Sequence, residues 1–312
     1  MSKSCILTVT QGDFLYIQEW IEHHHNIGVD LFLIGYNGKE EDFNKLPKYD
    51  YVRYFDFSVN ENPIHHRLDS SKVGFFTRDD YDSSIQNRDV APQIGMLNTM
   101  LHCVKLLYPN VDYTIVIDTD EFINIKNGTN NINEFLDEHF PKTHSSIQIK
   151  MCFYNTENIY YEDKPCQERF TNGFFLGNGR ENDYGCAKII INNNHKDSYK
   201  INMNSAHICS FYINGFMLDP NIIELKHFFT KTLEEWISKF NTSIDKDYIN
   251  RFRGKLLHNF FFDHCGNTFN EMTEEKMKAI PQLLEKYNVN YDPSTEELNE
   301  EIREYYKKCN NL

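Results

Sequence analysis

The sequence has no excess of positive charge. Its 312 residues include 46 Asp and Glu but only 32 Lys and Arg, which gives a formal net charge of −14. Nucleic acids and anionic membranes are polyanions, so proteins that bind them through their overall field carry the opposite balance. We therefore expect no nucleic-acid partner, and a ligand that carries phosphate would need a local group of cations or a bound metal ion.

The sequence also lacks the cysteine patterns of zinc sites and disulfide frameworks. Its eight cysteines include no C-x-x-C pair and no zinc-like array with histidine, so we expect reduced thiols. No stretch approaches the roughly 20 apolar residues of a membrane span, and the first residues lack the apolar run of a signal peptide. These absences predict a cytoplasmic protein without a transmembrane segment, and peripheral attachment to a membrane stays open.

Alternating apolar and amphipathic segments predict an α/β fold. Residues 4–10 and 29–36 are apolar runs typical of buried strands. Residues 14–26 between them have helical periodicity, with Asp13 as the expected N-cap. A strand–helix–strand unit of this kind builds a parallel sheet, and residues 51–57 predict a third strand.

The pattern continues through the chain. Residues 92–108 predict a helix that Pro109 ends, and residues 113–117 suit a central parallel strand. Further helices are expected at 131–139, at 232–240 (capped by Thr232 with Glu235) and over the last 40 residues, with further strands at 145–153, 188–191 and 221–229. The sequence therefore predicts a Rossmann-like, mostly parallel central sheet flanked by helices, with a helical C-terminal portion.

Two carboxylates follow the apolar run at 113–117. On an extended chain alternate residues point the same way, so Asp118 and Asp120 are expected to project together from the end of the strand. Adjacent carboxylates repel unless a cation intervenes, and open parallel sheets bind ligands at the carboxyl ends of their strands. Mg²⁺ and Mn²⁺ prefer oxygen ligands and complete their shells with phosphate oxygens and water. The pair indicates a metal–diphosphate site; the alternative is an acidic turn that caps the next element.

The segment Val116-Ile117-Asp118-Thr119-Asp120-Glu121-Phe122 resembles the Asp-x-Asp-Glu-Phe signature of family-2-like and family-92-like GT-A glycosyltransferases. Further segments resemble those families in the same order: Gln18–His24, Gly28-Val29-Asp30, Gln93, Glu168-Arg169-Phe170, Lys188-Ile189-Ile190, Ala206-His207, Leu225–Phe228 and Lys231–Glu235. The resemblance implies a GT-A domain over residues 1–240, with a nucleotide-sugar half at about 1–125 and an acceptor half at about 126–240. A C-terminal helical extension would follow over 241–312.

The resemblance also implies which residues hold the nucleoside. These are Thr10 and Gln11 in the loop after the first strand, and Asn37 and Asp42 in the loop after the second. The loop at 36–42 matches the families' pattern only in part, so the base that it recognises stays open.

For the metal ion, the resemblance implies direct binding by Asp120, with Asp118 contacting the metal or the ribose, and with His207 or His227 as a third ligand. For each histidine an ordinary structural role is the alternative. The run His23-His24-His25 cannot share one ion, because consecutive helical residues point in different directions. We expect the middle histidine of that run to pack in the core and its neighbours to be solvated.

The resemblance assigns Lys188 to neutralising the departing diphosphate, with Arg169 or Arg180 doing the same from a mobile loop. A solvated lysine at a strand edge is the alternative for Lys188. An inverting transfer also needs a base for the acceptor hydroxyl, and three acidic residues are candidates: Glu157, Glu168 and Asp183. We favour Asp183, and a retaining mechanism would need no such base.

These observations predict a glycosyltransferase that depends on Mn²⁺ or Mg²⁺ and inverts the anomeric centre of the transferred sugar. Its donor would be a UDP-, GDP- or dTDP-sugar, and its acceptor a glycan or a lipid-linked glycan. Two alternatives stay open: a sugar nucleotidyltransferase, which usually has a Gly-rich cationic N-terminal loop where this chain has Thr-Gln-Gly-Asp, and a non-catalytic glycan-binding domain. Fold resemblance alone does not decide between them.

Overall fold

The computed structural model describes residues 2–11, 13–57, 91–156, 158–175, 187–203, 216–242, 256–262, 270–291 and 300–311. The chain divides into two compact units. The first unit comprises Met1–Cys152 with Gly177–His227, and the second comprises Phe153–Leu176 with Phe228–Leu312. The sequence-based division at residue 240 stays a prediction about domains; helix α6 (Leu233–Thr242) packs against α9 (Glu274–Lys286) in the second unit.

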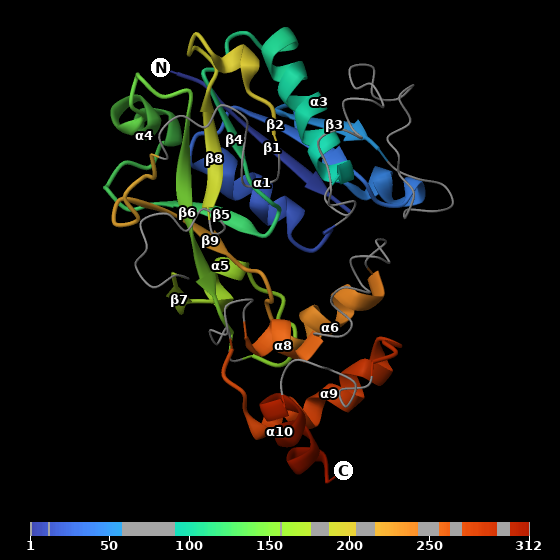
Figure 1. The fold of residues 1–312 in the computed structure, drawn as a ribbon. Helices are drawn as coiled ribbons and strands as arrows, with labels where there is room; N and C mark the ends of the chain where they lie inside the picture. The colour runs from blue at the N-terminus through green and yellow to red at the C-terminus, as the bar shows by residue number, and fades with distance from the viewer. Residues whose placement is uncertain are drawn as a thin grey trace. The chain divides into compact units, whose positions relative to one another are not determined.

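A parallel sheet forms the core of the first unit. Its strands are β1 (Ser4–Thr10), β2 (Leu31–Tyr36), β3 (Val52–Asp56) and β4 (Tyr113–Val116). They lie in the order β3-β2-β1-β4, and each neighbouring pair is parallel (Figure 1). Every residue of β2 and β4 is buried, as expected for strands covered on both faces. The four predicted strands are confirmed.

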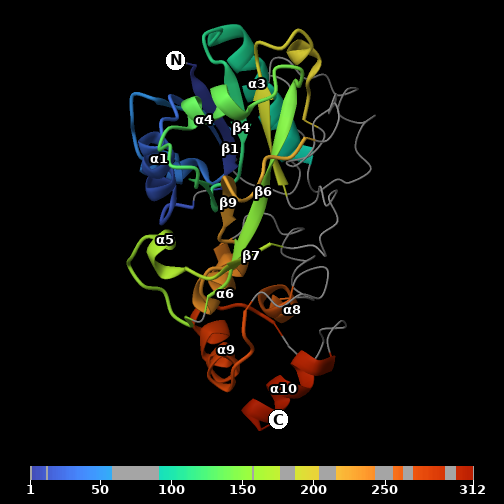
Figure 2. The ribbon, with the colours of Figure 1, turned by 90° about the vertical axis from the view of Figure 1, so that its left-hand side faces the viewer.

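Helices cover both faces of this sheet. Side chains alternate between the faces of a strand, and helix α3 (Ala91–Leu107) packs with Leu31 and Leu33 while Trp20 of α1 (Ile17–Asn26) contacts Phe32. The two helices therefore lie on opposite faces (Figure 2). A third helix, α4 (Ile132–His139), is capped by Asn131, whose side chain accepts hydrogen bonds from the amides of Asn133 and Glu134.

Two sequence-based details of α1 are wrong. The N-cap residue is Tyr16 without a side-chain cap, because the chain from Asp13 first makes a hydrogen-bonded turn through the carbonyl of Asp13. His24 is fully buried as predicted, but His23, expected to be solvated, is partly buried and hydrogen-bonded.

Antiparallel strands extend the sheet beyond β4. They are β8 (Ala187–Asn192), β6 (Ser146–Tyr154), β9 (Ile223–His227) and β5 (Glu121–Ile125), in that order. β8 pairs antiparallel with β4 and β6, and β5 pairs antiparallel with β9. Two 3₁₀ turns, Glu40–Lys45 and Ser198–Lys200, lie in connections. The predicted α/β class, a central sheet flanked by helices, is confirmed; strand β5 was not predicted.

The second unit is mainly helical in its described part, as predicted for the C-terminal portion. It contains α5 (Cys166–Arg169), β7 (Gly173–Phe174), α6, α8 (Leu256–Phe261), α9 and α10 (Glu300–Asn310). β7 pairs with the last two residues of β6. Large side chains form its core: Trp236, Phe260, Phe261, Met277, Ile280 and Leu283. Thr232 and Glu235 exchange hydrogen bonds at the start of α6, which confirms the predicted capping box.

Arg169 belongs to this unit and does not lie in the mobile loop that we expected. It ends α5, its side chain is fully buried, and Nη1 lies 2.9 Å from a carboxylate oxygen of Glu235. Its guanidinium also lies over the rings of Tyr161 and Phe170. The buried pair holds α5 to the start of α6, which is a structural role. Among the described helices, none combines the length and apolar character needed to cross a bilayer.

Candidate functional site

The segment after β4 folds into an acidic turn. The amide of Glu121 donates to the carbonyl of Asp118 at 3.2 Å, and the amide of Asp118 donates to Glu121 Oε2 at 2.7 Å. These reciprocal bonds close the turn and start β5 directly at Glu121. Asp118 therefore begins the turn and Asp120 lies within it, so the extended geometry expected for them is wrong. The two carboxylates have different partners as a result.

Asp118 is bound by two side chains from other elements. Lys188 on β8 donates to Asp118 Oδ2 at 2.5 Å, and Gln93 on α3 donates to Oδ1 at 3.2 Å. Lys188 also lies 3.4 Å from Glu121 Oε1, and the Lys188 side chain has no exposed surface. Burial opposes its charge, but attraction by Asp118 and Glu121 outweighs burial and raises the pKa of Lys188. The ammonium is thus a fixed counter-charge between two carboxylates.

Asp120 lies beside a histidine from a distant part of the chain. His227, the last residue of β9, faces Glu121 across the antiparallel pair. Its Nε2 lies 3.6 Å from Asp120 Oδ1 and 4.0 Å from Glu121 Oε1. One ligand atom from each of these three residues can be chosen so that all lie within 4.8 Å of one another. We call Asp120, Glu121 and His227 the ligand cluster.

Glu121 is the unusual member of the ligand cluster. Its side chain is fully buried, and among the described residues Oε1 has no hydrogen-bond partner. Burial raises the pKa of this carboxyl to about 7, with Lys188 opposing the rise and Asp118 adding to it. Oε1 thus has the charge of Lys188 at 3.4 Å but no hydrogen bond, which leaves it able to accept a further ligand such as a cation. Two carboxylates and an imidazole are also ligands that Mn²⁺ accepts, so the residues present fit a divalent ion.

The residues predicted to hold a nucleoside lie at the same end of the sheet as the ligand cluster, where strands β1, β2 and β4 have their carboxyl ends. Thr10 ends β1, and its carbonyl accepts from the amide of Asn37 at 2.8 Å. Gly38 brings the second loop against the first, because a Cβ there would clash with the carbonyl of Gln11 and the hydroxyl of Tyr36. This arrangement brings Thr10, Gln11 and Asn37 together.

Asp42 lies further along, in the 3₁₀ turn, where its carboxylate pairs with Lys45 at 2.5 Å. Several predicted residues fall outside the part of the chain that the structure describes: Glu157, Arg180, Asp183 and His207. Glu168 lies in α5 of the second unit. Sequence reasoning left Glu121 out of the candidate metal ligands, although it stands within the acidic run Asp118–Glu121 and within the signature.

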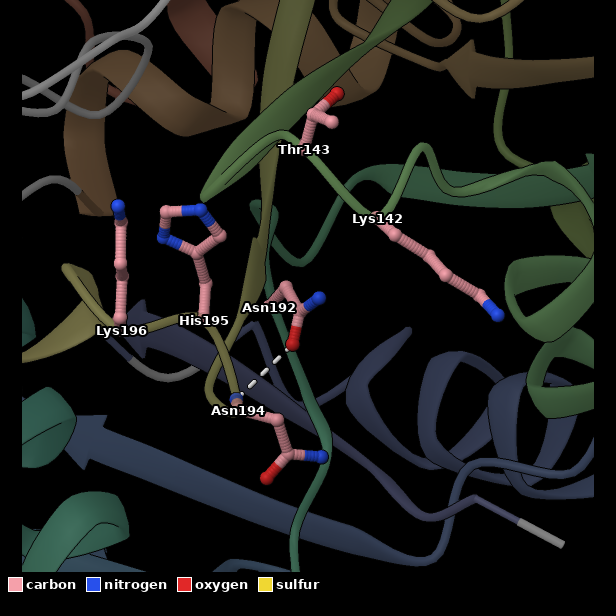
Figure 3. Close-up of a pocket in the computed structure, with 6 residues that line it drawn as sticks. All are labelled: Lys142, Thr143, Asn192, Asn194, His195 and Lys196. Carbon is pink, nitrogen blue, oxygen red and sulfur yellow. Dashed lines mark hydrogen bonds between the residues drawn. The ribbon is translucent and has the colours of Figure 1, made fainter.

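A separate polar pocket lies at the opposite end of the sheet, near the amino end of β4. It has a volume of about 470 Å³ and is lined by Lys142, Thr143, Asn192, Asn194, His195 and Lys196. Asn192 pairs with the first residue of β4, whereas Ile189 pairs with its last, so the length of β8 separates this pocket from Lys188. The side chains of Lys142 and Lys196 point in different directions (Figure 3). The pocket therefore offers no converging group of cations to a diphosphate.

Comparison with known proteins bears on this geometry. No curated protein matches the chain. The family model described as glycosyltransferase family 92 matches residues 3–261. That span contains the parallel sheet, the acidic turn, Lys188 and the whole ligand cluster. The chain therefore belongs to glycosyltransferase family 92 and is an enzyme that transfers a glycosyl group.

Proposed function

We propose that this glycosyltransferase takes its sugar from a nucleoside-diphosphate donor, and that Asp120, Glu121 and His227 hold a Mn²⁺ or Mg²⁺ ion against the donor's diphosphate. The observation that carries the proposal is the buried Glu121 oxygen within reach of both other ligands. Its place beyond the carboxyl end of β4 is where open α/β sheets bind ligands. A divalent ion bound there would neutralise charge on the departing diphosphate.

Lys188 and Asp118 are the other charged side chains at the site, and they have different roles. Lys188 is fully buried between two carboxylates, so we assign it to fixing Asp118 and Glu121 rather than to touching phosphate. The side chain of Asp118 is 35% exposed and is oriented by Gln93 and Lys188. Asp118 can therefore contact the donor ribose or the metal ion while its geometry stays fixed.

The proposal also covers the residues that contact the nucleoside, the acceptor and the catalytic base. Thr10, Gln11 and Asn37 meet at the ends of β1 and β2 and would contact the nucleoside, with Asp42 further out. The acceptor would be a glycan or a lipid-linked glycan, and transfer would invert the anomeric centre with Asp183 as base. Family membership favours glycosyl transfer over the nucleotidyl transfer and the pure glycan binding that we considered.

Ligand-dependent thermal stabilisation tests the metal and the donor. UDP, GDP, dTDP and CMP would each be added with and without Mn²⁺ to the wild type, to Asp120→Asn and to Glu138→Gln. Glu138 is a matched control because its side chain is 72% exposed on α4. A ligand at 100 times its Kd stabilises the native state by about 2.7 kcal/mol.

We expect one diphosphate to stabilise the wild type and Glu138→Gln only when Mn²⁺ is present, and Asp120→Asn to lose that effect. The nucleotide that binds would identify the donor's base. Equal stabilisation of Asp120→Asn and the wild type would show that the ligand cluster does not hold the metal ion.

A further inference from the structure

We propose that three ring side chains of helix α1, those of Trp20, His23 and His24, are positioning residues for the metal site. They hold the backbone of β5 in place and thereby fix the carboxylate of Glu121. The inference rests on the proposed function, because the group that they position belongs to the ligand cluster. All of these residues lie in the first unit.

The three side chains bond to the main chain of the first residues of β5. The indole N–H of Trp20 donates to the carbonyl of Glu121 at 2.7 Å. His23 Nε2 lies 2.8 Å from the carbonyl of Ile123 and acts as donor to it, while His24 Nε2 accepts from the amide of Ile123 at 3.2 Å. Trp20 and His24 have no exposed surface, so these bonds are shielded from water.

The bonding partners determine the protonation of His24. Because Nε2 accepts from an amide, the proton must lie on Nδ1, which is 2.8 Å from the carbonyl of Trp20 and donates to it. Burial, followed by the neighbouring His23, lowers the pKa of His24 well below its ordinary value, which agrees with a neutral ring. A protonated ring would lose the acceptor that the amide of Ile123 uses.

These contacts provide partners for the main-chain groups on the unpaired side of β5. In the described sheet β5 is an edge strand that pairs with β9 on one side only. The amides and carbonyls on the other side of an edge strand need partners from elsewhere when they are buried. Alternate residues of a strand point their main-chain groups to the same side. Glu121 and Ile123 are such a pair, and α1 satisfies the carbonyl of Glu121 and both main-chain groups of Ile123. Side chains of a helix thus replace a neighbouring strand.

Ring packing adds to the hydrogen bonds. The rings of His23 and His24 lie 5.3 and 5.8 Å from that of Phe122, which is fully buried, and the rings of Trp20 and His24 lie 4.8 Å apart. Residues 121–123 are therefore held by hydrogen bonds and by aromatic contacts from one helix.

The attachment reaches the ligand cluster directly. Glu121 accepts the indole hydrogen bond through its carbonyl, closes the acidic turn with Asp118, and carries the buried oxygen of the cluster. Groups that orient metal ligands through hydrogen bonds affect metal affinity by roughly 10- to 100-fold. Loss of the Trp20 or His24 bond should therefore weaken the metal site even when the protein stays folded.

Helix α1 supplies its own matched control. His25 is on the same helix, but its ring stacks on Tyr51 at 3.8 Å and its Nδ1 lies 3.2 Å from the carbonyl of Val29. A change at His25 removes a histidine from α1 without removing a bond to β5.

The experiment measures Mn²⁺ binding by calorimetry and unfolding free energy by urea denaturation for each variant. Trp20→Phe keeps an aromatic ring and removes the indole N–H, and His24→Phe removes the acceptor for Ile123. His24→Gln supplies a side-chain oxygen that can accept the hydrogen bond from the amide of Ile123. The controls are His25→Phe and Asp120→Asn, and affinities are compared where each variant is folded.

We expect Trp20→Phe and His24→Phe to weaken Mn²⁺ binding about 10-fold or more, His24→Gln to recover part of the loss, and His25→Phe to stay within about two-fold. A purely structural role would lower the unfolding free energy without changing the affinity of the folded protein. If Trp20→Phe and His24→Phe fold and bind Mn²⁺ like the wild type while Asp120→Asn does not bind, the inference is wrong and the proposed function stands. If Asp120→Asn binds like the wild type, both fail.

Discussion

Replacing Lys188 with methionine would remove a buried ammonium and keep a side chain of similar length. The ammonium lies 3.4 Å from Glu121 Oε1, a separation at which two unit charges attract by about 5 kcal/mol at an effective dielectric constant of about 20. The desolvation of both groups offsets part of that attraction. Removing one partner of a buried pair nevertheless costs roughly 3–5 kcal/mol, because the other charge stays buried alone. The side chain of Asp118 is 35% exposed, so water compensates it in part.

We therefore expect Lys188→Met to lower the unfolding free energy of the first unit by about 3 kcal/mol or more. Adding Glu121→Gln removes the uncompensated charge and should restore roughly 1–3 kcal/mol. The control is Lys200→Met, since Lys200 pairs with Asp197 and the two side chains are 38% and 21% exposed. That pair should contribute no more than about 1 kcal/mol.

The assay can report the first unit alone. The chain has two tryptophans, Trp20 in the first unit and Trp236 in the second. In a Trp236→Phe background, the fluorescence of Trp20 follows unfolding of the first unit in urea. If Lys188→Met unfolds within about 1 kcal/mol of its parent and Glu121→Gln brings no recovery, Lys188 does not hold the carboxylates together and our assignment of its role is refuted.

Three further predictions follow from described contacts. The pKa of His24 is well below that of an unfolded histidine, so below pH 6.5 the unfolded state binds a proton that the native state does not. The stability of the wild type relative to His24→Gln should therefore fall by up to about 1.4 kcal/mol per pH unit as the pH drops. A constant difference between the two proteins in urea titrations from pH 7 to 5 would contradict this. Gly38→Ala should weaken nucleotide binding in the thermal-shift assay because its Cβ would displace the loop at Gln11, and unchanged binding would show that the two loops do not need this contact. Asn270→Ala removes buried hydrogen bonds in the second unit and should destabilise that unit by about 3 kcal/mol, read from Trp236 fluorescence in a Trp20→Phe background, where an unchanged midpoint would count against the network.

Local patterns predicted most of the elements, because buried strands and amphipathic helices depend on residues close in the sequence. The runs at 4–10, 29–36 and 113–117 became strands as expected. Strand β5 was not predicted because its first residue is the last of an acidic run, which has the composition of a loop. Its edge is stabilised by ring side chains of α1 about 100 positions away, and local composition carries no signal of such a contact.

The ligand cluster was predicted only in part for a similar reason. Asp120 and His227 were both candidates, and the structure brings them together. The sequence could not choose between His207 and His227, because His227 reaches the site through the pairing of β9 with β5, which joins residues about 100 positions apart. Lys188 likewise meets Asp118 through the antiparallel pairing of β8 with β4. Nonlocal strand pairing decides these contacts.

If the ligand cluster holds a metal ion as proposed, the burial of Lys188 has a consequence for the valence of that ion. Asp118, Asp120 and Glu121 carry three negative charges when ionised, and the fixed ammonium cancels one of them. A divalent ion would balance the remaining two, whereas a monovalent ion would leave a buried negative charge and a trivalent ion a buried positive one. Since buried net charge is costly, we expect the proposed site to bind doubly charged cations better than potassium or lanthanide ions in the absence of a nucleotide.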